Sequence, residues 1–275
     1  MSSTRIAGIA IWGLVLGATG AAQENSPLPE GNAYVRSLLA EQRQQDDAIS
    51  AFSYDLEETR EHLSKHGVAT SKTTLKYQVY FVKTRQVRRL ISRNGVPLSP
   101  KEQASVDRKA EERARDIREG RVATEQVGVR LSRLFESFDF KTVGRSEPHG
   151  RSAIELDFRP LKDKPREPNG VGVGDRLLKM LAGRVVIDET DRRVVRLQAR
   201  SDEHLSASVA TGVKLGSINF SVEFLPLGDK VWLPSRVETF ASGRAFLIVT
   251  FRVRQTSTYS NYRRFKVETE ERTVR

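Results

Sequence analysis

The last third of the chain carries the feature that most constrains its fold, a regular alternation of apolar and polar residues. Over residues 217–224 every second side chain is apolar: Ile218, Phe220, Val222 and Phe224. A period of two predicts a β-strand with one buried face and one wet face. Similar runs, separated by turn signals at 188–192, 228–229 and 242–243, predict a meander of about five strands over residues 183–255.

The preceding residues predict both helices and strands. Residues 99–119 begin with Ser99-Pro100-Lys101-Glu102, a capping box with proline at the first helical position. The other expected helices span 33–49 (capped by Asn32), 124–135 and 176–182, the other strands 52–61, 74–81, 87–93 and 152–159, and the loops 144–150 and 160–174. Strands do not alternate with helices in βαβ units, so we expect an α+β fold with a mostly antiparallel sheet. The charged residues 256–275 are expected to form a final edge strand or to fray.

The first 22 residues predict a signal peptide. Arg5 precedes an apolar run from Ile6 to Leu16, and the small residues Gly20-Ala21-Ala22 suit a signal peptidase. A membrane anchor is the alternative, but the run is about half of the ~20 residues that a helix needs to cross a bilayer. We therefore expect residues 1–22 to be removed, 23–31 to form a linker, 32–265 to form a single domain, and 266–275 to form a charged tail.

Composition narrows the class of protein. The chain of 275 residues has no cysteine, which excludes disulfides, zinc–thiolate sites and a lipid on a cleavage-site cysteine. Its net charge of +11 falls only to +10 when residues 1–22 are removed, because Arg5 is their one charged residue. A strongly basic surface attracts anionic partners. For a soluble protein exported to the periplasm, we expect these partners to be membrane surfaces, lipids or acidic proteins rather than nucleic acid.

No group of residues in the sequence indicates catalysis. His62 and His66 have the spacing of metal ligands on a helix, but they fall in a strand and turn, where such side chains need not converge. Gly170, Gly172 and Gly174 lack the preceding strand of a dinucleotide-binding fingerprint. A G-x-S-x-G motif is also absent. We therefore expect a protein that is not an enzyme and has no cofactor and no metal.

Two short segments resemble a known family. They are the hairpin from Gly183-Arg184-Val185-Val186-Ile187-Asp188 to Val194-Val195-Arg196-Leu197, and the strand start Val231-Trp232-Leu233-Pro234-Ser235. Both are similar to segments of the half-barrel family of bacterial outer-membrane lipoprotein-sorting proteins, the LolA/LolB-like fold that the large domain of RseB-like stress regulators shares. The resemblance implies a curved, unclosed antiparallel sheet of about nine or more strands. Inserted helices on its concave side would close an apolar cavity for acyl chains.

This chain also departs from the family pattern. The helix expected at 99–119 is almost wholly charged, and the sequence lacks a carrier motif. The resemblance therefore leaves the cargo open.

Aromatic residues of the expected strands are the candidates for lining a ligand cavity. They are Phe52, Tyr54, Tyr77, Phe81, Phe220, Phe224, Trp232 and Phe251. A plain hydrophobic core is the alternative reading, because a curved sheet leaves apolar space for a ligand only where its helices pack loosely.

The C-terminal segment is unevenly basic and has aromatic residues between its arginines. Arg252, Arg254, Arg263 and Arg264 suit docking to a lipid headgroup or to a partner protein. The alternative is that these charges protect an edge strand from pairing with other chains.

Two functions fit these expectations. The first is binding of a lipid or lipoprotein acyl chain in an apolar cavity, in outer-membrane lipoprotein or lipid trafficking. The second is an envelope scaffold or stress-sensing interaction protein in which the same half-barrel is filled. An open apolar volume favours the first function, and a filled interior favours the second.

Overall fold

A computed structural model describes residues 26–121, 130–161, 181–201, 213–228, 231–245 and 249–264. In chain order the elements are α1 (Gly31–Ala48), η1 (Ile49–Ala51), β1 (Phe52–Leu63), β2 (Ala69–Val82), β3 (Arg85–Arg93), β4 (Val96–Pro97), α2 (Pro100–Arg118), α3 (Leu131–Ser137), β5 (Phe138–Ser146), η2 (Pro148–Gly150), β6 (Ala153–Pro160), β7 (Leu181–Asp188), β8 (Val194–Ser201), β9 (Val213–Leu227), β10 (Val231–Ala245) and β11 (Val249–Arg264). Within these ranges the fold is α+β, as expected.

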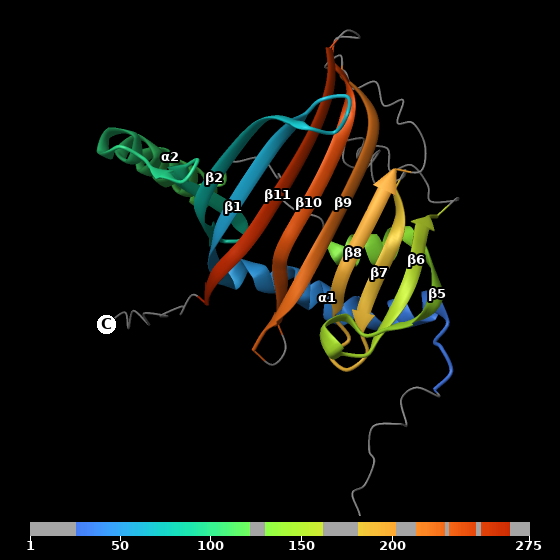
Figure 1. The fold of residues 1–275 in the computed structure, drawn as a ribbon. Helices are drawn as coiled ribbons and strands as arrows, with labels where there is room; N and C mark the ends of the chain where they lie inside the picture. Colours follow the sequence, from blue (N-terminus) through green and yellow to red (C-terminus); the bar gives the residue numbers. More distant parts are fainter. Residues whose placement is uncertain are drawn as a thin grey trace, which may run out of the picture.

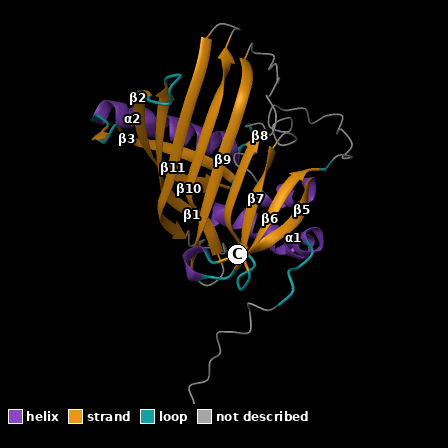
Figure 2. Ribbon diagram, turned by 45° about the vertical axis from the view of Figure 1, so that its right-hand side comes forward, coloured by secondary structure: helices purple, strands orange, loops and turns teal. Residues whose placement is uncertain are grey.

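The described strands form one curved, unclosed sheet of 11 strands in the order β4-β3-β2-β1-β11-β10-β9-β8-β7-β6-β5 (Figure 1). Every neighbouring pair is antiparallel. Strands β9, β10 and β11 have 15, 15 and 16 residues, and Figure 2 shows them rising well beyond the shorter strands β5 to β8. The sheet is therefore tall in its middle and short on the β5 side.

The C-terminal strand lies in the middle of the sheet, which corrects the expectation for residues 256–275. Residues 256–264 are the second half of β11, and this strand pairs with β10 on one side and with β1 on the other. They are neither an edge strand nor frayed. The expected tail at 266–275 lies outside the described residues.

Several expected element boundaries are wrong. The last residues of β5 were expected to belong to a loop at 144–150. The first residues of β5 directly follow α3, and no turn signal in the sequence separates the two elements. Leu181 and Ala182, expected at the end of a helix, begin β7, and the rest of that helix lies outside the described residues. Ser242 and Gly243, expected to turn, lie inside β10 and pair with β9 and β11. Pairing with neighbouring strands outweighs the local turn preference at these positions.

Most of the buried core lies between one face of the sheet and the helices α1 and α3. Figure 1 shows α1 crossing behind several strands. Its residues Val35 and Leu38 are almost inaccessible and contact buried residues of α3, β5, β6, β7 and β8: Leu131, Leu134, Phe135, Phe138, Phe140, Ile154, Leu156, Phe158, Leu181, Val185, Ile187, Val194, Leu197 and Ala199. We call this side of the sheet the α1 face.

The ends of α1 are set by side chains on neighbouring segments. Glu30, rather than the expected Asn32, caps the helix by accepting hydrogen bonds from the backbone N–H groups of Asn32 and Ala33. The Asn32 side chain instead accepts a 2.8 Å bond from the backbone N–H of Phe140. This bond fixes the start of α1 against β5.

Helix α2 packs on the opposite face of the sheet from α1. Its buried residues Ala110, Ala114 and Ile117 contact Val87 of β3 and the half-buried Tyr80 and Val82 of β2. These β2 residues alternate with Tyr77 and Phe81, which lie on the α1 face. The inserted helices were expected on the concave side of the sheet. Helix α3 lies on the α1 face, but α2 lies on the opposite face. The apolar stripe of α2 is small, so it can pack there with most of its surface exposed. The expected capping box at Ser99 and Glu102 is confirmed.

Candidate functional site

Strand register defines which residues share the α1 face. Paired residues in neighbouring strands lie on the same face, and side chains alternate along each strand. One row of paired residues crosses most of the sheet: Leu197, Val222, Val237, Ser257, Glu58, Leu75 and Arg93. Because Leu197 belongs to the core under α1, the whole row lies on the α1 face.

Four of the predicted cavity residues come together on this face. Tyr54 lies at the centre of a group that we call the tyrosine cluster: Phe52, Tyr54, Tyr77, Phe81, Tyr259 and Tyr262. Its ring centroid lies 5.5 Å from that of Tyr259 and 5.1 Å from that of Tyr262. The sequence did not indicate these two tyrosines as cavity residues. They are three residues apart, so simple alternation would place them on opposite faces, and the register irregularity opposite Ser53 and Asp55 is what brings both beside Tyr54.

The tyrosine cluster is well packed and its polar ends are engaged. Tyr54 is 2% exposed, and its hydroxyl accepts a 2.6 Å hydrogen bond from Nε2 of Gln86. The Tyr262 hydroxyl donates a 2.6 Å bond to the carbonyl oxygen of Pro234. Burial raises the pKa of Tyr54, Tyr259 and Tyr262 above the ordinary value, so all three phenols stay neutral near pH 7.

The other four predicted cavity residues lie elsewhere. Phe220 and Phe224 are half-buried and pack against the core under α1. Phe251 is half-buried near the start of β11, opposite Gly243. Trp232 is 3% exposed and belongs to a separate cluster with Ala153, Val186 and Val195. The predicted residues thus form two groups on the α1 face, plus Trp232 beside the β7–β8 turn.

Next to the tyrosine cluster the α1 face carries an apolar strip over strands β9, β10 and β11, which includes the predicted residues Phe220 and Phe251. Its residues are all half-buried: Ile218, Phe220, Val222, Val237, Ala241, Phe251 and Val253. The opposite positions of the same strands are mostly polar, with Ser217, Asn219, Ser242 and Arg254 among them. The middle of the sheet is therefore more apolar on the side of α1, where Thr239, Gln255 and Ser257 are polar positions, than on the other side, where Phe240 is a large apolar residue.

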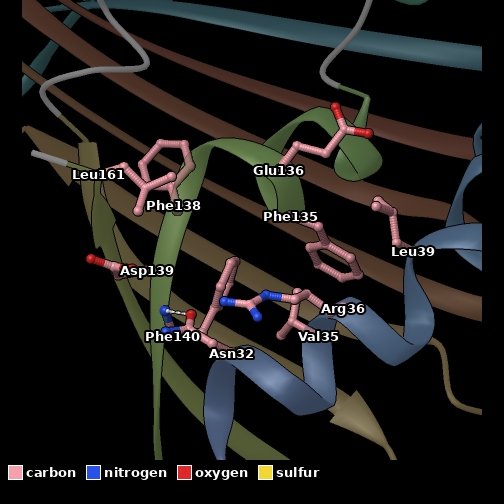
Figure 3. Close-up of a pocket in the computed structure, with 10 residues that line it drawn as sticks. All are labelled: Asn32, Val35, Arg36, Leu39, Phe135, Glu136, Phe138, Asp139, Phe140 and Leu161. Atoms are coloured by element: carbon pink, nitrogen blue, oxygen red, sulfur yellow. Dashed lines mark hydrogen bonds between the residues drawn. The ribbon is translucent and has the colours of Figure 1, made fainter. Parts of the chain in front are cut away.

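A small pocket with both apolar and charged lining residues lies between α1, α3 and β5 (Figure 3). It has a volume of about 150 Å³ and is lined by Asn32, Val35, Arg36, Leu39, Phe135, Glu136, Phe138, Asp139, Phe140 and Leu161. Ligand pockets that enclose a whole small molecule usually have at least ~300 Å³, whereas ~150 Å³ holds a molecule the size of benzene. The pocket can therefore accept the end of an apolar chain but not a complete lipid. The sequence missed it because β5 was not expected.

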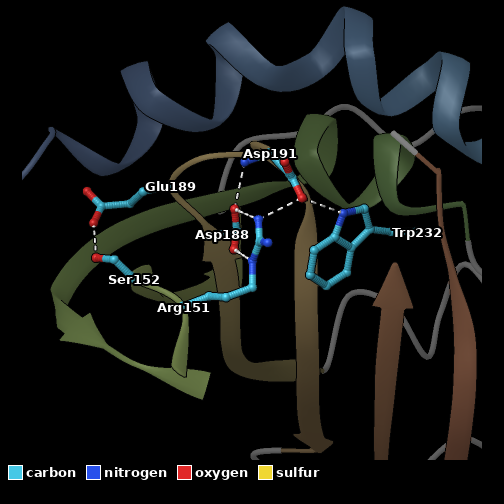
Figure 4. A network of polar contacts seen from close by, with 6 residues as sticks. All are labelled: Arg151, Ser152, Asp188, Glu189, Asp191 and Trp232. Carbon is cyan, nitrogen blue, oxygen red and sulfur yellow. Dashed lines mark hydrogen bonds and ion pairs between the residues drawn. The ribbon is translucent and has the colours of Figure 1, made fainter. Parts of the chain in front are cut away.

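The turn between β7 and β8 contains a buried ionic network (Figure 4). Asp188 is fully buried and accepts bonds of 2.6 and 3.1 Å from the guanidinium group of Arg151. Arg151 also donates a 2.7 Å bond to Asp191, and the Trp232 indole N–H donates a 3.2 Å bond to the same carboxylate oxygen. Beside them, the Ser152 hydroxyl donates to Glu189. The network cross-links the η2 region, the β7–β8 turn and β10.

The same turn is fastened to α1. Arg192 donates to the backbone carbonyl oxygen and the hydroxyl of Ser37, at 3.2 and 3.0 Å. Arg193 donates a 3.0 Å bond to Glu41. The polar residues of this turn thus hold α1 in place across the sheet, which is a structural role.

Asp188 should make the fold sensitive to acid. Burial by itself would raise the pKa of its carboxyl group, but the hydrogen bonds from Arg151 and from the backbone N–H of Asp191 outweigh burial, so this pKa lies below its ordinary value. The stabilisation is complete above the unfolded-chain pKa of about 3.9 and is lost as the pH falls through the lower folded-state pKa. The free energy of unfolding in urea, measured from about pH 6 to about pH 2, should fall more steeply for the native chain than for Asp188→Asn. Equal slopes would contradict this assignment.

The predicted docking arginines do not form one patch. Arg252 and Arg254 lie on the face opposite α1, and Arg254 is paired with Glu61 at 3.4 Å. Arg263 and Arg264 are exposed at the end of β11, opposite Ser53 and Phe52. The alternative of edge-strand protection is wrong because β11 is an inner strand. Docking at these arginines stays a prediction.

Two features are absent from the described residues. Over these ranges, no three His, Asp or Glu residues gather in a way that could hold a metal ion. The helices within them are too short or too polar to span a bilayer.

Comparison with known proteins gives a likeness at the level of solved structures. No protein-family model matches the chain, and no curated protein matches it. An outer membrane lipoprotein-sorting protein domain from Vibrio parahaemolyticus is similar over 85% of this chain and 93% of its own, with 12% identity and a TM-score of 0.38. A DUF1329 family protein from Desulfovibrio piger is similar over 86% of this chain and 94% of its own, with 11% identity and a TM-score of 0.35. The family noted from the sequence motifs is thus also the family that the first of these structures is named for.

Proposed function

We propose that the chain is an exported, non-enzymatic protein of the periplasm that binds an acyl chain of a lipid or lipoprotein on the α1 face. The observation that carries this proposal is the apolar strip over β9, β10 and β11, where seven half-buried apolar side chains lie between the tyrosine cluster and the core under α1. An acyl chain laid on this strip would remove apolar area from water, at roughly 0.8 kcal/mol for each buried CH₂ group.

A second candidate function is an envelope scaffold, and the tyrosine cluster favours it. Phe52 and Tyr54, two of the predicted cavity residues, are 6% and 2% exposed and are packed against neighbouring rings. That part of the half-barrel is filled by its own side chains. The two functions therefore differ in whether the apolar strip takes a ligand.

A charge placed in the apolar strip should strongly weaken acyl-chain binding. Ala241→Glu puts a carboxylate in the middle of the strip, where an acyl chain would have to desolvate it. Binding of a fluorescent fatty acid to the purified mature protein should weaken by about 100-fold, as expected for the loss of roughly four buried CH₂ groups. Native mass spectrometry of protein from the periplasm should show co-purified lipid with the native chain and none with the variant.

Ser242→Glu is the matched control, because it adds the same charge at the next residue of β10, on the opposite face. It should bind the fatty acid like the native chain, and circular dichroism should show that both variants fold. A native chain that carries no lipid and binds no fatty acid would overturn the proposal and leave the scaffold function. Equal affinity of the two variants would show that the strip is not the binding surface.

A further inference from the structure

Three arginines gather around one tyrosine on the α1 face, at the β3 side of the sheet. The guanidinium carbon of Arg88 lies 5.9 Å from the ring centroid of Tyr77, a distance typical of a cation–π contact. Arg88 also donates 2.9 Å bonds to Glu58 and to the side-chain oxygen of Gln86. These contacts hold its guanidinium group beside the ring of Tyr77.

Arg60 and Arg93 lie beside it on the same face. Arg93 pairs with Leu75, two residues from Tyr77 along β2, and Arg60 is two residues from Glu58 along β1. Partial burial, and after it the charge of Glu58, raises the pKa of Tyr77. The positive charges of Arg88, Arg60 and Arg93 act against this increase. All three arginines are exposed. We call them the arginine group.

The arginine group carries more positive than negative charge. Glu58 is paired with Arg88 at 2.9 Å. Arg60 donates a 3.0 Å bond to the neutral side chain of Gln255, and within the described ranges neither it nor Arg93 has an ion-pair partner. Three guanidinium groups thus lie around the carboxylate of Glu58, and the charge of Arg93 also acts on Glu102 at the start of α2. By comparison, Arg151 and Arg184 each pair with two carboxylates, so the arginine group has a local excess of positive charge.

The arginine group lies at one end of the apolar strip. The row Arg93, Leu75, Glu58, Ser257 and Val237 leads directly from it to the strip. Neighbouring strands are ~4.8 Å apart, so the three steps from β2 to β10 cover about 14 Å. A bilayer core ~30 Å thick holds two acyl chains end to end, about 15 Å each. An acyl chain whose polar end lies over β2 would therefore reach the strip.

We propose that Arg60, Arg88 and Arg93 form a binding site for the oxyanion headgroup, a phosphate or a carboxylate, of an amphiphile whose acyl chain lies on the apolar strip. Guanidinium groups bind such oxyanions through paired N–H donors, and an adjacent aromatic ring suits the first carbons of the chain. This assignment rests on the proposed acyl-chain function and specifies its substrate class as anionic.

The test compares ligands that share a chain and differ in headgroup. Binding of dodecyl phosphate, dodecyl maltoside and inorganic phosphate to the full mature chain is measured by calorimetry, and the neutral dye N-phenyl-1-naphthylamine reports on the apolar surface independently. The native chain should bind dodecyl phosphate at least about tenfold more tightly than dodecyl maltoside. The double variant Arg60→Gln/Arg93→Gln should lose about tenfold in affinity for dodecyl phosphate and keep its affinity for the maltoside and the dye.

A matched control removes the same charge on the other face. Arg200 and Arg244 are exposed on β8 and β10, opposite α1, and Arg200→Gln/Arg244→Gln should behave like the native chain. Equal affinity of the native chain for the phosphate and the maltoside would overturn the headgroup site and leave acyl-chain binding intact. Failure of the dye and both detergents to bind would instead overturn the proposed function. Inorganic phosphate binding as tightly as dodecyl phosphate would also overturn the headgroup assignment, because the site would then recognise a free oxyanion.

Discussion

Replacement of Gly183 by alanine should unfold or severely destabilise the protein. A Cβ atom at this position of β7 would overlap the backbone carbonyl oxygen of Gln198 and come within 2.8 Å of the Cα atom of Ala199. Both obstacles belong to the backbone of β8, so no side chain can move aside. We expect a loss of more than about 4 kcal/mol in the free energy of unfolding, measured by urea denaturation.

Gly144→Ala provides the comparison. Gly144 also lies inside a strand, β5, but an added Cβ would have no atom within 4 Å. Alanine loses less conformational freedom than glycine on folding, so this variant should be unchanged or slightly more stable, by less than about 1 kcal/mol. If Gly183→Ala were as stable as Gly144→Ala, the close approach of β7 and β8 would be wrong.

Removal of the Asp188 carboxylate should produce the next largest loss. Asp188→Ala deletes both bonds to Arg151 and the 2.6 Å bond that the backbone N–H of Asp191 donates. Breaking a buried ion pair by removing one partner costs about 3–5 kcal/mol. Arg151 is 40% exposed and keeps its bond to Asp191, so we expect the lower end, about 3 kcal/mol at pH 7.

An exposed ion pair of the same kind serves as the control for this variant. Asp157 is 53% exposed and pairs with Arg184 at 2.8 Å. Because solvent screens exposed charges, Asp157→Ala should cost less than about 1 kcal/mol. Chemical denaturation of both variants at pH 7 checks the ranking, and a loss at Asp188 no greater than that at Asp157 would contradict a stabilising role for the network.

The sequence predicted the elements that depend on neighbouring residues. The capping box at Ser99 and Glu102 and the helix expected at 33–49, found as α1 (Gly31–Ala48), are confirmed, because both patterns are local. Strand β5 was missed because Phe138 and Phe140 continue the apolar residues of α3 without a break. In the sequence, Gly183 has the position of a glycine that ends a helix. Glycine is needed there because the backbone of β8 lies too close to leave room for a Cβ atom.

Features that depend on distant pairing were beyond the sequence pattern. Tyr259 and Tyr262 join Tyr54 only because β11 pairs with β1, and alternation cannot tell an inner strand from an edge strand. The arginine group needs β1, β2 and β3 in the correct register. That register includes an irregularity between Lys76 and Tyr77, which decides whether Arg93 shares the face of Tyr77. A shift of one residue would place Arg93 on the side of α2.

The pairing of β1 with β11 also determines when the sheet can be completed during biosynthesis. Phe52 pairs with Arg264, so strands β1 to β3 gain their connection to the remaining strands only after almost the whole chain has been made. Until then β1 has an open edge, and contacts between residues so far apart in sequence form slowly. Strands β1 to β3 can therefore join the rest of the sheet only after β11 has been made. A chain truncated before β11 would form two separate pieces of sheet. If the chain is exported as proposed, this delay helps it to stay unfolded during export.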